Sequence, residues 1–197
     1  CGAIYFTNSV ASPLIFGSTF DKNQTTSSHG GAIANNSNLH ISDSTFTNNS
    51  TAMTSATYGG AVYNASNLTV SGSTFTNNAV PNILATDTTA EIMGAGGAIY
   101  NGKNLAVNNS VFTGNIGYIS GAIGLADDSF TVITNSTFDK NTAVGGGVFH
   151  GSDDIDTTHY LSIYDSTFTG NSATAGSGGV IRFANNSNTF IYGSSFE

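Results

Sequence analysis

A short pattern that contains Phe and Asn returns along the whole chain and limits the fold more than any other feature. "STFTNN" stands at Ser44–Asn49 and again at Ser73–Asn78, and looser copies occur elsewhere. Aligned on the Phe, spaced 26 to 37 residues apart, the copies lie at Phe20, Phe46, Phe75, Phe112, Phe138, Phe168 and Phe196. Three residues after the first six Phe stand Asn23, Asn49, Asn78, Asn115, Asn141 and Asn171. Such a period is typical of a solenoid, in which each copy is one structural unit.

Each copy predicts two short strands with a corner between them. Leu39 and Ile41 alternate with polar neighbours, which indicates a strand with one buried face. A straight strand would send Ile41 and Phe46 to opposite faces, so the chain must turn between them if both are buried. Three residues before every Phe stands Gly, Asp or Asn, the residues that best tolerate a left-handed backbone. A Ser always follows this corner, and we expect its small size to let neighbouring corners close tightly.

A glycine-containing element precedes the strand pairs and predicts a third strand. It reads GGAI, GGAV or a close variant, starting at Gly30, Gly59, Gly96, Ser120, Gly145 and Gly178. Stacked copies would pair equivalent strands in parallel about 4.8 Å apart, with the Phe in one stack and the Asn in an amide ladder. We therefore expect an all-β fold, with residues 1–197 forming one parallel β-helix of about seven coils. The helix should be right-handed, because connections between parallel strands take that hand. Longer insertions fall at residues 79–95 and 151–160.

Composition excludes several classes of partner. Only 8% of the residues are charged, and 12 acidic residues against four Lys and Arg give a net charge of −8. This argues against a nucleic-acid partner, because phosphates are neutralised by clustered Lys and Arg. The chain has no run of 18 apolar residues, so we expect no direct membrane span.

The paired GGA(I/V) and FxxN motifs, in a chain rich in Ser, Thr, Asn and Gly, resemble the repeats of the chlamydial polymorphic outer membrane proteins. The stretch "GGAVYNASNLTVSGSTFTNN", Gly59–Asn78, is also similar to adhesin-like surface proteins of methanogenic archaea. This resemblance implies an extracellular or cell-surface protein that acts as a rigid stalk or binding surface. Its partner would be a surface protein or glycan of a host or neighbouring cell. The resemblance brings no catalytic residue, and we expect neither enzymatic activity nor a cofactor.

Two alternatives stay open. In the first, the chain is a subunit of an extracellular fibre and binds copies of itself end to end, since neither end carries a sequence that resembles a cap. In the second, it is a β-helical polysaccharide lyase or glycosidase that uses paired carboxylates, either Asp127 with Asp128 or the cluster of Asp153, Asp154 and Asp156. Arg182 is the only Arg and its nearest Lys in sequence is Lys140, so basic groups that would stabilise an enolate are scarce.

Other candidate sites give weaker signals. Asp153, Asp154 and Asp156 could supply oxygen ligands to calcium, but they lack the spacing of an EF-hand. The four His have no metal-ligand spacing, and we interpret them as polar residues near turns; they are His29, His40, His150 and His159. N-x-S/T sequons, which mark possible N-glycosylation, begin at Asn23, Asn35, Asn48, Asn49, Asn64, Asn67, Asn108, Asn135 and Asn185. A chain this rich in Asn, Ser and Thr also produces sequons by chance.

Overall fold

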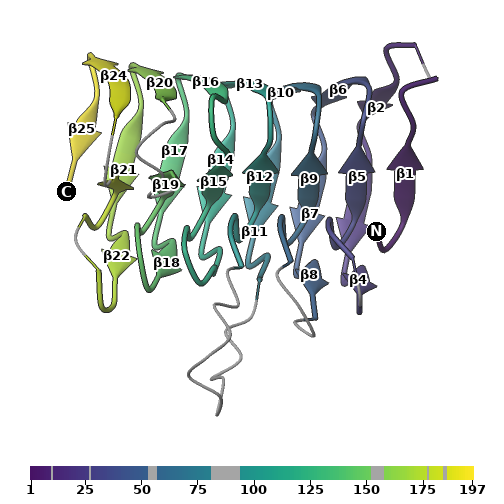
Figure 1. Ribbon diagram of the computed structural model, residues 1–197, viewed down its shortest axis with the longest axis horizontal. Coiled ribbons are helices and arrows are strands. Elements are labelled where there is room, and N and C mark those ends of the chain that lie inside the picture. The colour runs from purple at the N-terminus through teal and green to yellow at the C-terminus, as the bar shows by residue number, and fades with distance from the viewer. Residues whose placement is uncertain are drawn as a thin grey trace.

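The computed structural model describes residues 1–9, 11–26, 28–52, 57–80, 94–151, 158–176, 178–183 and 186–197. Across these ranges the chain forms strands β1 to β25 and no helix. The strands wind into an elongated stack of coils, with the two termini at opposite ends (Figure 1). The asparagine of the sequon at Asn185, most of the two predicted insertions and the calcium candidates Asp153, Asp154 and Asp156 lie outside the described residues.

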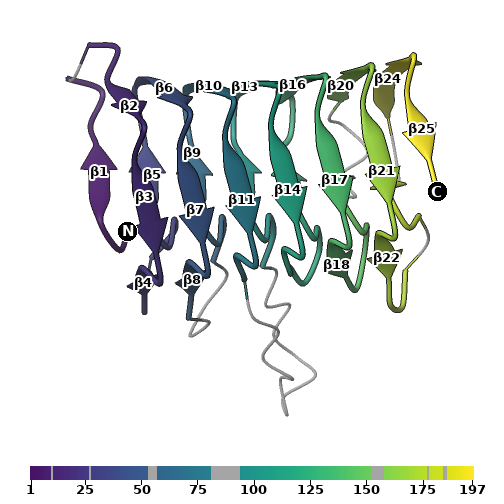
Figure 2. The same ribbon diagram turned by 180° about the vertical axis from the view of Figure 1, so that it is seen from behind.

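Three parallel sheets of seven strands run along the stack. Sheet A contains β1 (Ile4–Phe6), β5 (Ile33–Asn35), β9 (Val62–Asn64), β12 (Ile99–Asn101), β15 (Ile123–Leu125), β19 (Phe149–Gly151) and β23 (Ile181–Arg182). Sheet B contains β2 (Leu14–Phe16), β6 (Asn38–Ser42), β10 (Asn67–Ser71), β13 (Asn104–Asn108), β16 (Phe130–Thr134), β20 (His159–Tyr164) and β24 (Ser187–Tyr192). Sheet C, in front in Figure 2, contains β3 (Thr19–Asp21), β7 (Thr45–Thr47), β11 (Thr74–Thr76), β14 (Val111–Thr113), β17 (Thr137–Asp139), β21 (Thr167–Thr169) and β25 (Ser195–Phe196).

Each coil takes one strand from sheet A, then one from sheet B, then one from sheet C, which confirms the predicted parallel β-helix. Some coils add a fourth, two-residue strand after sheet C, which the sequence analysis did not foresee. These strands are β4 (Gln24–Thr25), β8 (Ser50–Thr51), β18 (Thr142–Ala143) and β22 (Ser172–Ala173), and they pair as β4 with β8 and β18 with β22.

The register places equivalent residues of successive coils side by side. Phe46 pairs with Phe20 on one side and with Phe75 on the other. All seven repeat phenylalanines form one stack, with neighbouring ring centroids 4.7 to 4.9 Å apart and nearly parallel planes. The inner five, Phe46 to Phe168, have no exposed surface. Stacking of copies therefore buries an aromatic column that a single repeat could not bury.

Two columns of left-handed residues make the corners around sheet C. The first, between sheets B and C, is the predicted one, with φ between 47° and 64° at Gly17, Asp43, Gly72, Asn109, Asn135, Asp165 and Gly193. The second comes two residues after each Phe, with φ between 52° and 62° at Lys22, Asn48, Asn77, Gly114, Lys140 and Gly170. Sequence reasoning missed the second column because Lys, which occupies it twice, is not a turn-forming residue.

Replacing Lys140 with Gly is expected to stabilise the fold by about 1 kcal/mol, because a left-handed conformation costs an L-residue about 1–2 kcal/mol and costs Gly almost nothing. The salt bridge that Lys140 makes with Asp139 is 3.4 Å long, and because the Lys140 side chain is largely exposed it contributes little. Thermal unfolding measures the change. The matched control is Lys103→Gly, at an exposed position without a positive φ, where the same substitution should destabilise; equal effects at both positions would contradict the prediction.

Hydrogen-bonded side chains line the same corners. In the asparagine ladder, Asn78 Nδ2 donates to Asn115 Oδ1 of the next coil at 3.0 Å and to the Phe46 carbonyl of the previous coil at 2.9 Å. Ser73 Oγ accepts a bond from the Ser44 backbone N–H at 3.1 Å and donates to the Ser71 carbonyl. The Ser column is thus a second hydrogen-bonded ladder, and the prediction that small size explains it was incomplete.

A third ladder, which the sequence analysis did not predict, lies between sheets A and B. Asn35 Nδ2 donates to Asn64 Oδ1 at 2.8 Å, and Asn64 Nδ2 donates to Asn101 Oδ1 at 2.9 Å. Asn101 Nδ2 ends the run by donating to the Thr131 hydroxyl. All four side chains are buried, so these bonds satisfy amide groups that would otherwise be costly to bury.

Candidate functional site

The outward side chains of the sheets are the residues available for binding, because the ladders and the apolar core occupy the inward positions. Two outer surfaces carry unusual groups. One is an aromatic cluster on sheet A and the corner before it. The other is the outer surface of sheet B, which we call the sheet B face.

The aromatic cluster brings one His and three Tyr together from successive coils. The His29 ring lies 4.7 Å from Tyr63, and Tyr58 lies 4.5 Å from Tyr100. Burial raises the pKa of Tyr100, with smaller contributions from Tyr58, Tyr63 and Asp127. Burial, and then Tyr58, raises the pKa of Tyr63, while burial lowers the pKa of His29. Tyr63, Tyr100 and His29 are therefore uncharged at neutral pH, which suits packing of one ring on another.

The sheet B face consists of three columns of outward residues that run along the stack. The first is Asn38, Asn67, Asn104, Phe130, Tyr160 and Asn188; the second is Leu14, His40, Thr69, Ala106, Val132, Ser162 and Phe190; the third is Phe16, Ser42, Ser71, Asn108, Thr134, Tyr164 and Tyr192. None of these residues is Lys, Arg, Asp or Glu. The face is therefore a neutral surface on a chain whose net charge is −8.

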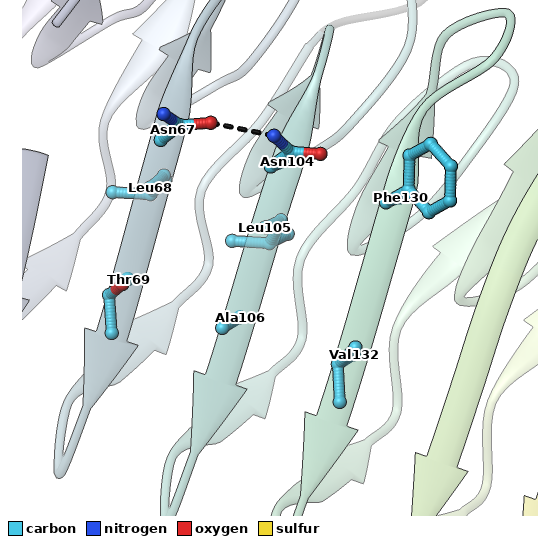
Figure 3. A pocket seen from close by; sticks show the side chains of 8 residues that line it. All are labelled: Asn67, Leu68, Thr69, Asn104, Leu105, Ala106, Phe130 and Val132. Carbon is cyan, nitrogen blue, oxygen red and sulfur yellow. Dashed lines mark hydrogen bonds between the residues drawn. The ribbon is translucent and has the colours of Figure 1, made fainter. Parts of the chain in front are cut away.

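A shallow hollow of about 260 Å³ lies near the middle of the sheet B face (Figure 3). It is lined from β10, β13 and β16 by Asn67, Leu68, Thr69, Asn104, Leu105, Ala106, Phe130 and Val132. Asn67 Nδ2 donates to Asn38 Oδ1 at 2.6 Å, and Asn104 Nδ2 donates to Asn67 Oδ1 at 2.7 Å. The Phe130 ring, 50% exposed, stacks on Tyr160 with centroids 4.3 Å apart. The hollow thus joins a row of amides to an aromatic ring.

The predicted carboxylate candidates are exposed in the loop between β15 and β16. Asp128 has a φ of 53°, and its Oδ1 accepts a hydrogen bond from the Thr158 backbone N–H at 3.1 Å. Asp127 is next to it in sequence and is also exposed. Asp128 therefore has a structural role in joining this loop to the next coil.

The four His lie in different surroundings. His40 is on the sheet B face, and His29 is in the aromatic cluster. His150 contacts Arg182 one coil further on, and His159 stacks on Phe183 while its Nδ1 lies 3.2 Å from the Ala126 carbonyl. Within the described residues, no three His, Cys, Asp or Glu side chains lie close enough to hold a metal ion.

The fold separates the predicted sequons into two groups. Asn35, Asn49 and Asn64 are fully buried in ladders. The side-chain amide of Asn23 belongs to the same ladder as Asn49, because Asn23 Nδ2 donates to Asn49 Oδ1. The exposed group consists of Asn48, Asn67, Asn108 and Asn135.

Any N-linked glycan on the folded protein is expected on the exposed group alone, because a sugar on a buried ladder amide would break its bonds to the adjacent coils. Mass spectrometry of peptides from protein made in a host with N-glycosylation tests this expectation. Asn48 and Asn49 are an adjacent pair that serves as an internal comparison. A glycan on Asn49 and none on Asn48 would contradict it.

A family model described as a right-handed β-helix region matches residues 2–196. The chain therefore belongs to the right-handed β-helix family, and the predicted hand of the helix is confirmed. Comparisons with curated proteins and with solved structures give no match. In the part of the chain that the structure describes, no helix is long and apolar enough to cross a membrane.

Proposed function

We propose that this β-helix is an adhesin-like repeat protein of the cell surface or extracellular space, a rigid stalk that presents a binding face. The finer resemblance to polymorphic outer membrane protein repeats and archaeal adhesin-like proteins rests on the GGA(I/V) and FxxN motifs. Its partner is a surface protein or glycan of a host or neighbouring cell.

The observation that carries this proposal is the contrast between the inward and outward columns. The inward Phe stack keeps one residue type in every coil, whereas a single outward column of the sheet B face changes from amide to aromatic. Phe130 and Val132 are exposed there, 50% and 41%. Outward apolar side chains in a neutral surface are typical of a site that binds a partner.

The ladders support the role of a rigid stalk. Each coil is joined to the next by three parallel sheets and by rows of buried Asn and Ser hydrogen bonds. Because these bonds run along the stack axis, bending would break several of them at once. The chain therefore holds its outer faces at fixed positions along a straight body, as Figure 1 shows.

Attachment assays test the proposal. Residues 1–197 displayed on a non-adherent cell should mediate attachment to cells or glycan-coated surfaces under flow, and soluble chain should compete. Failure to attach to any surface in a broad panel would overturn the proposal. Long end-to-end polymers in sedimentation would favour the fibre alternative. Glycan cleavage that is lost in an Asp127→Asn or Asp128→Asn variant would favour the enzyme alternative.

A further inference from the structure

We propose that the hollow on the sheet B face is a subsite for one sugar ring of a neutral glycan, with Phe130 and Asn104 as its two contacts. This inference rests on the proposed function, because it names the class of partner that the binding face takes. Three features carry it: the end of the exposed amide row, the aromatic ring beside that end, and the absence of charged residues from the three columns of the sheet B face.

The amide row supplies a hydrogen-bond acceptor at the hollow. In this row each Nδ2 donates to the Oδ1 of the previous coil, from Asn104 to Asn67 and from Asn67 to Asn38. Asn104 is the last amide, because the next residue in the column is Phe130. Its Oδ1 points toward β16 in Figure 3 and has no donor among the described residues. A hydroxyl of a bound ligand would complete the row.

The aromatic side of the hollow supplies an apolar contact. Phe130 is supported by Tyr160 on the next coil, with ring planes only 7° apart. This support fixes the ring on a strand, so little side-chain freedom is lost on binding. Aromatic faces carry negative charge density and attract the weakly positive C–H groups of a ring laid against them. Ala106 and Val132 leave the space that such a ring would fill.

A neutral sugar ring fits the hollow in size and offers both a hydroxyl for the Asn104 oxygen and C–H groups for the Phe130 ring. It has hydroxyls around its edge and C–H groups on its faces. An acidic glycan would find no cation in the three columns of the sheet B face, since exposed Lys103 stands outside them just before β13, and the chain as a whole has a net charge of −8. The hollow, about 260 Å³, is smaller than the roughly 300–1,000 Å³ of pockets that enclose a drug-sized ligand. It therefore suits one ring of a longer chain.

A peptide strand fits the site less well than a sugar. The usual way for a peptide to bind a sheet is to pair with a free edge. At the hollow, β13 already pairs with β10 and with β16, so its backbone offers no free edge. A peptide could therefore contact only side chains here, namely the amide oxygen of Asn104 and the ring of Phe130.

The test is calorimetric titration of the purified chain with neutral oligosaccharides built from glucose, mannose, galactose or xylose, and with uronic-acid oligosaccharides. At least one neutral series should bind, with little dependence on salt because no charges pair. Phe130→Ala removes the ring, and Ala106→Leu fills the hollow; each should weaken binding about tenfold or more. Phe16→Ala is the matched control, an outward Phe of the same face on β2, 66% exposed, and should leave binding unchanged.

Several results would overturn the inference. They are no binding of any neutral oligosaccharide, binding of uronic-acid oligosaccharides alone, binding that neither hollow variant weakens, and a need for Phe130 in self-association instead. The attachment assay separates this inference from the proposed function. Attachment that survives Phe130→Ala would leave the proposed function in place without the sugar site. Sugar binding by a chain that mediates no attachment would leave the sugar site in place and overturn the proposed function.

Discussion

Replacing Phe75 with Ala is expected to lower the free energy of unfolding by about 3–5 kcal/mol, the usual cost of truncating a buried aromatic side chain. Phe75 has no exposed surface and lies between Phe46 and Phe112, each with its ring centroid 4.7 Å away. The hydrogen-bonded strands β7, β11 and β14 hold these rings at a fixed spacing. The neighbours therefore cannot close the cavity, and the cost should fall in the upper part of the range.

Urea unfolding followed by circular dichroism measures this loss. Phe130→Ala is the comparison, because it removes the same side chain from the outward surface, where half of it is already exposed. Its cost should be much smaller, and this also means that the sugar-binding test uses a folded variant. Similar losses in the two variants would contradict the view that the Phe stack stabilises the stack of coils.

The fold could be predicted because the columns that define each coil, the Phe stack and the corner residues before it, keep one chemical role in every copy. The step from Ile41 to Phe46 requires a corner if both are buried, and the structure places Asp43 there with a φ of 49°. The seven Phe align with one another because parallel pairing brings equal positions together. A sequence repeat and the geometry of a parallel sheet thus suffice to predict the coil, its strands and its aromatic stack.

Other parts of the fold could not be derived from residue preference. Lys22 and Lys140 adopt positive φ, 55° and 53°, because the equivalent residues of every coil must turn at that point, whatever their own preference. The ladder through Asn35, Asn64 and Asn101 did leave a signal, since each stands eleven residues before a repeat Phe. Its end at Thr131 left none, because Thr131 belongs to the next strand rather than to the same column.

The residues of the candidate site could be found in the sequence, but the hollow that they form could not. Asn38, Asn67, Asn104, Phe130 and Tyr160 each stand eight residues before a repeat Phe, so the column could have been found by alignment on the Phe. The hollow could not, because it depends on how far the side chains around Ala106 reach across three strands. The Phe and asparagine columns around sheet C repeat and can be recognised in the sequence, whereas the outward site is formed where Phe130 departs from its column of Asn.

Replacing Asn78 with Ala should lower the free energy of unfolding by about 3 kcal/mol, because each buried polar group left without a partner costs about 1–3 kcal/mol. The Asn78 amide binds two backbone groups of the previous coil. Its Oδ1 accepts from the Asn49 N–H at 3.0 Å, and its Nδ2 donates to the Phe46 carbonyl at 2.9 Å. Ala can replace neither bond, and Asn78 has no exposed surface through which water could enter.

The adjacent Asn77 gives the matched control for this ladder variant. Asn77 is exposed and has a φ of 52°, which Asn tolerates better than Lys does and which Gly adopts without strain, so Asn77→Gly should change stability little. Urea unfolding gives both free energies. Hydrogen exchange locates the damage, since Asn78→Ala should remove protection from the Asn49 amide while that of distant coils persists. Equal stability of the two variants, with Asn49 still protected, would show that the asparagine ladder does not hold one coil to the next.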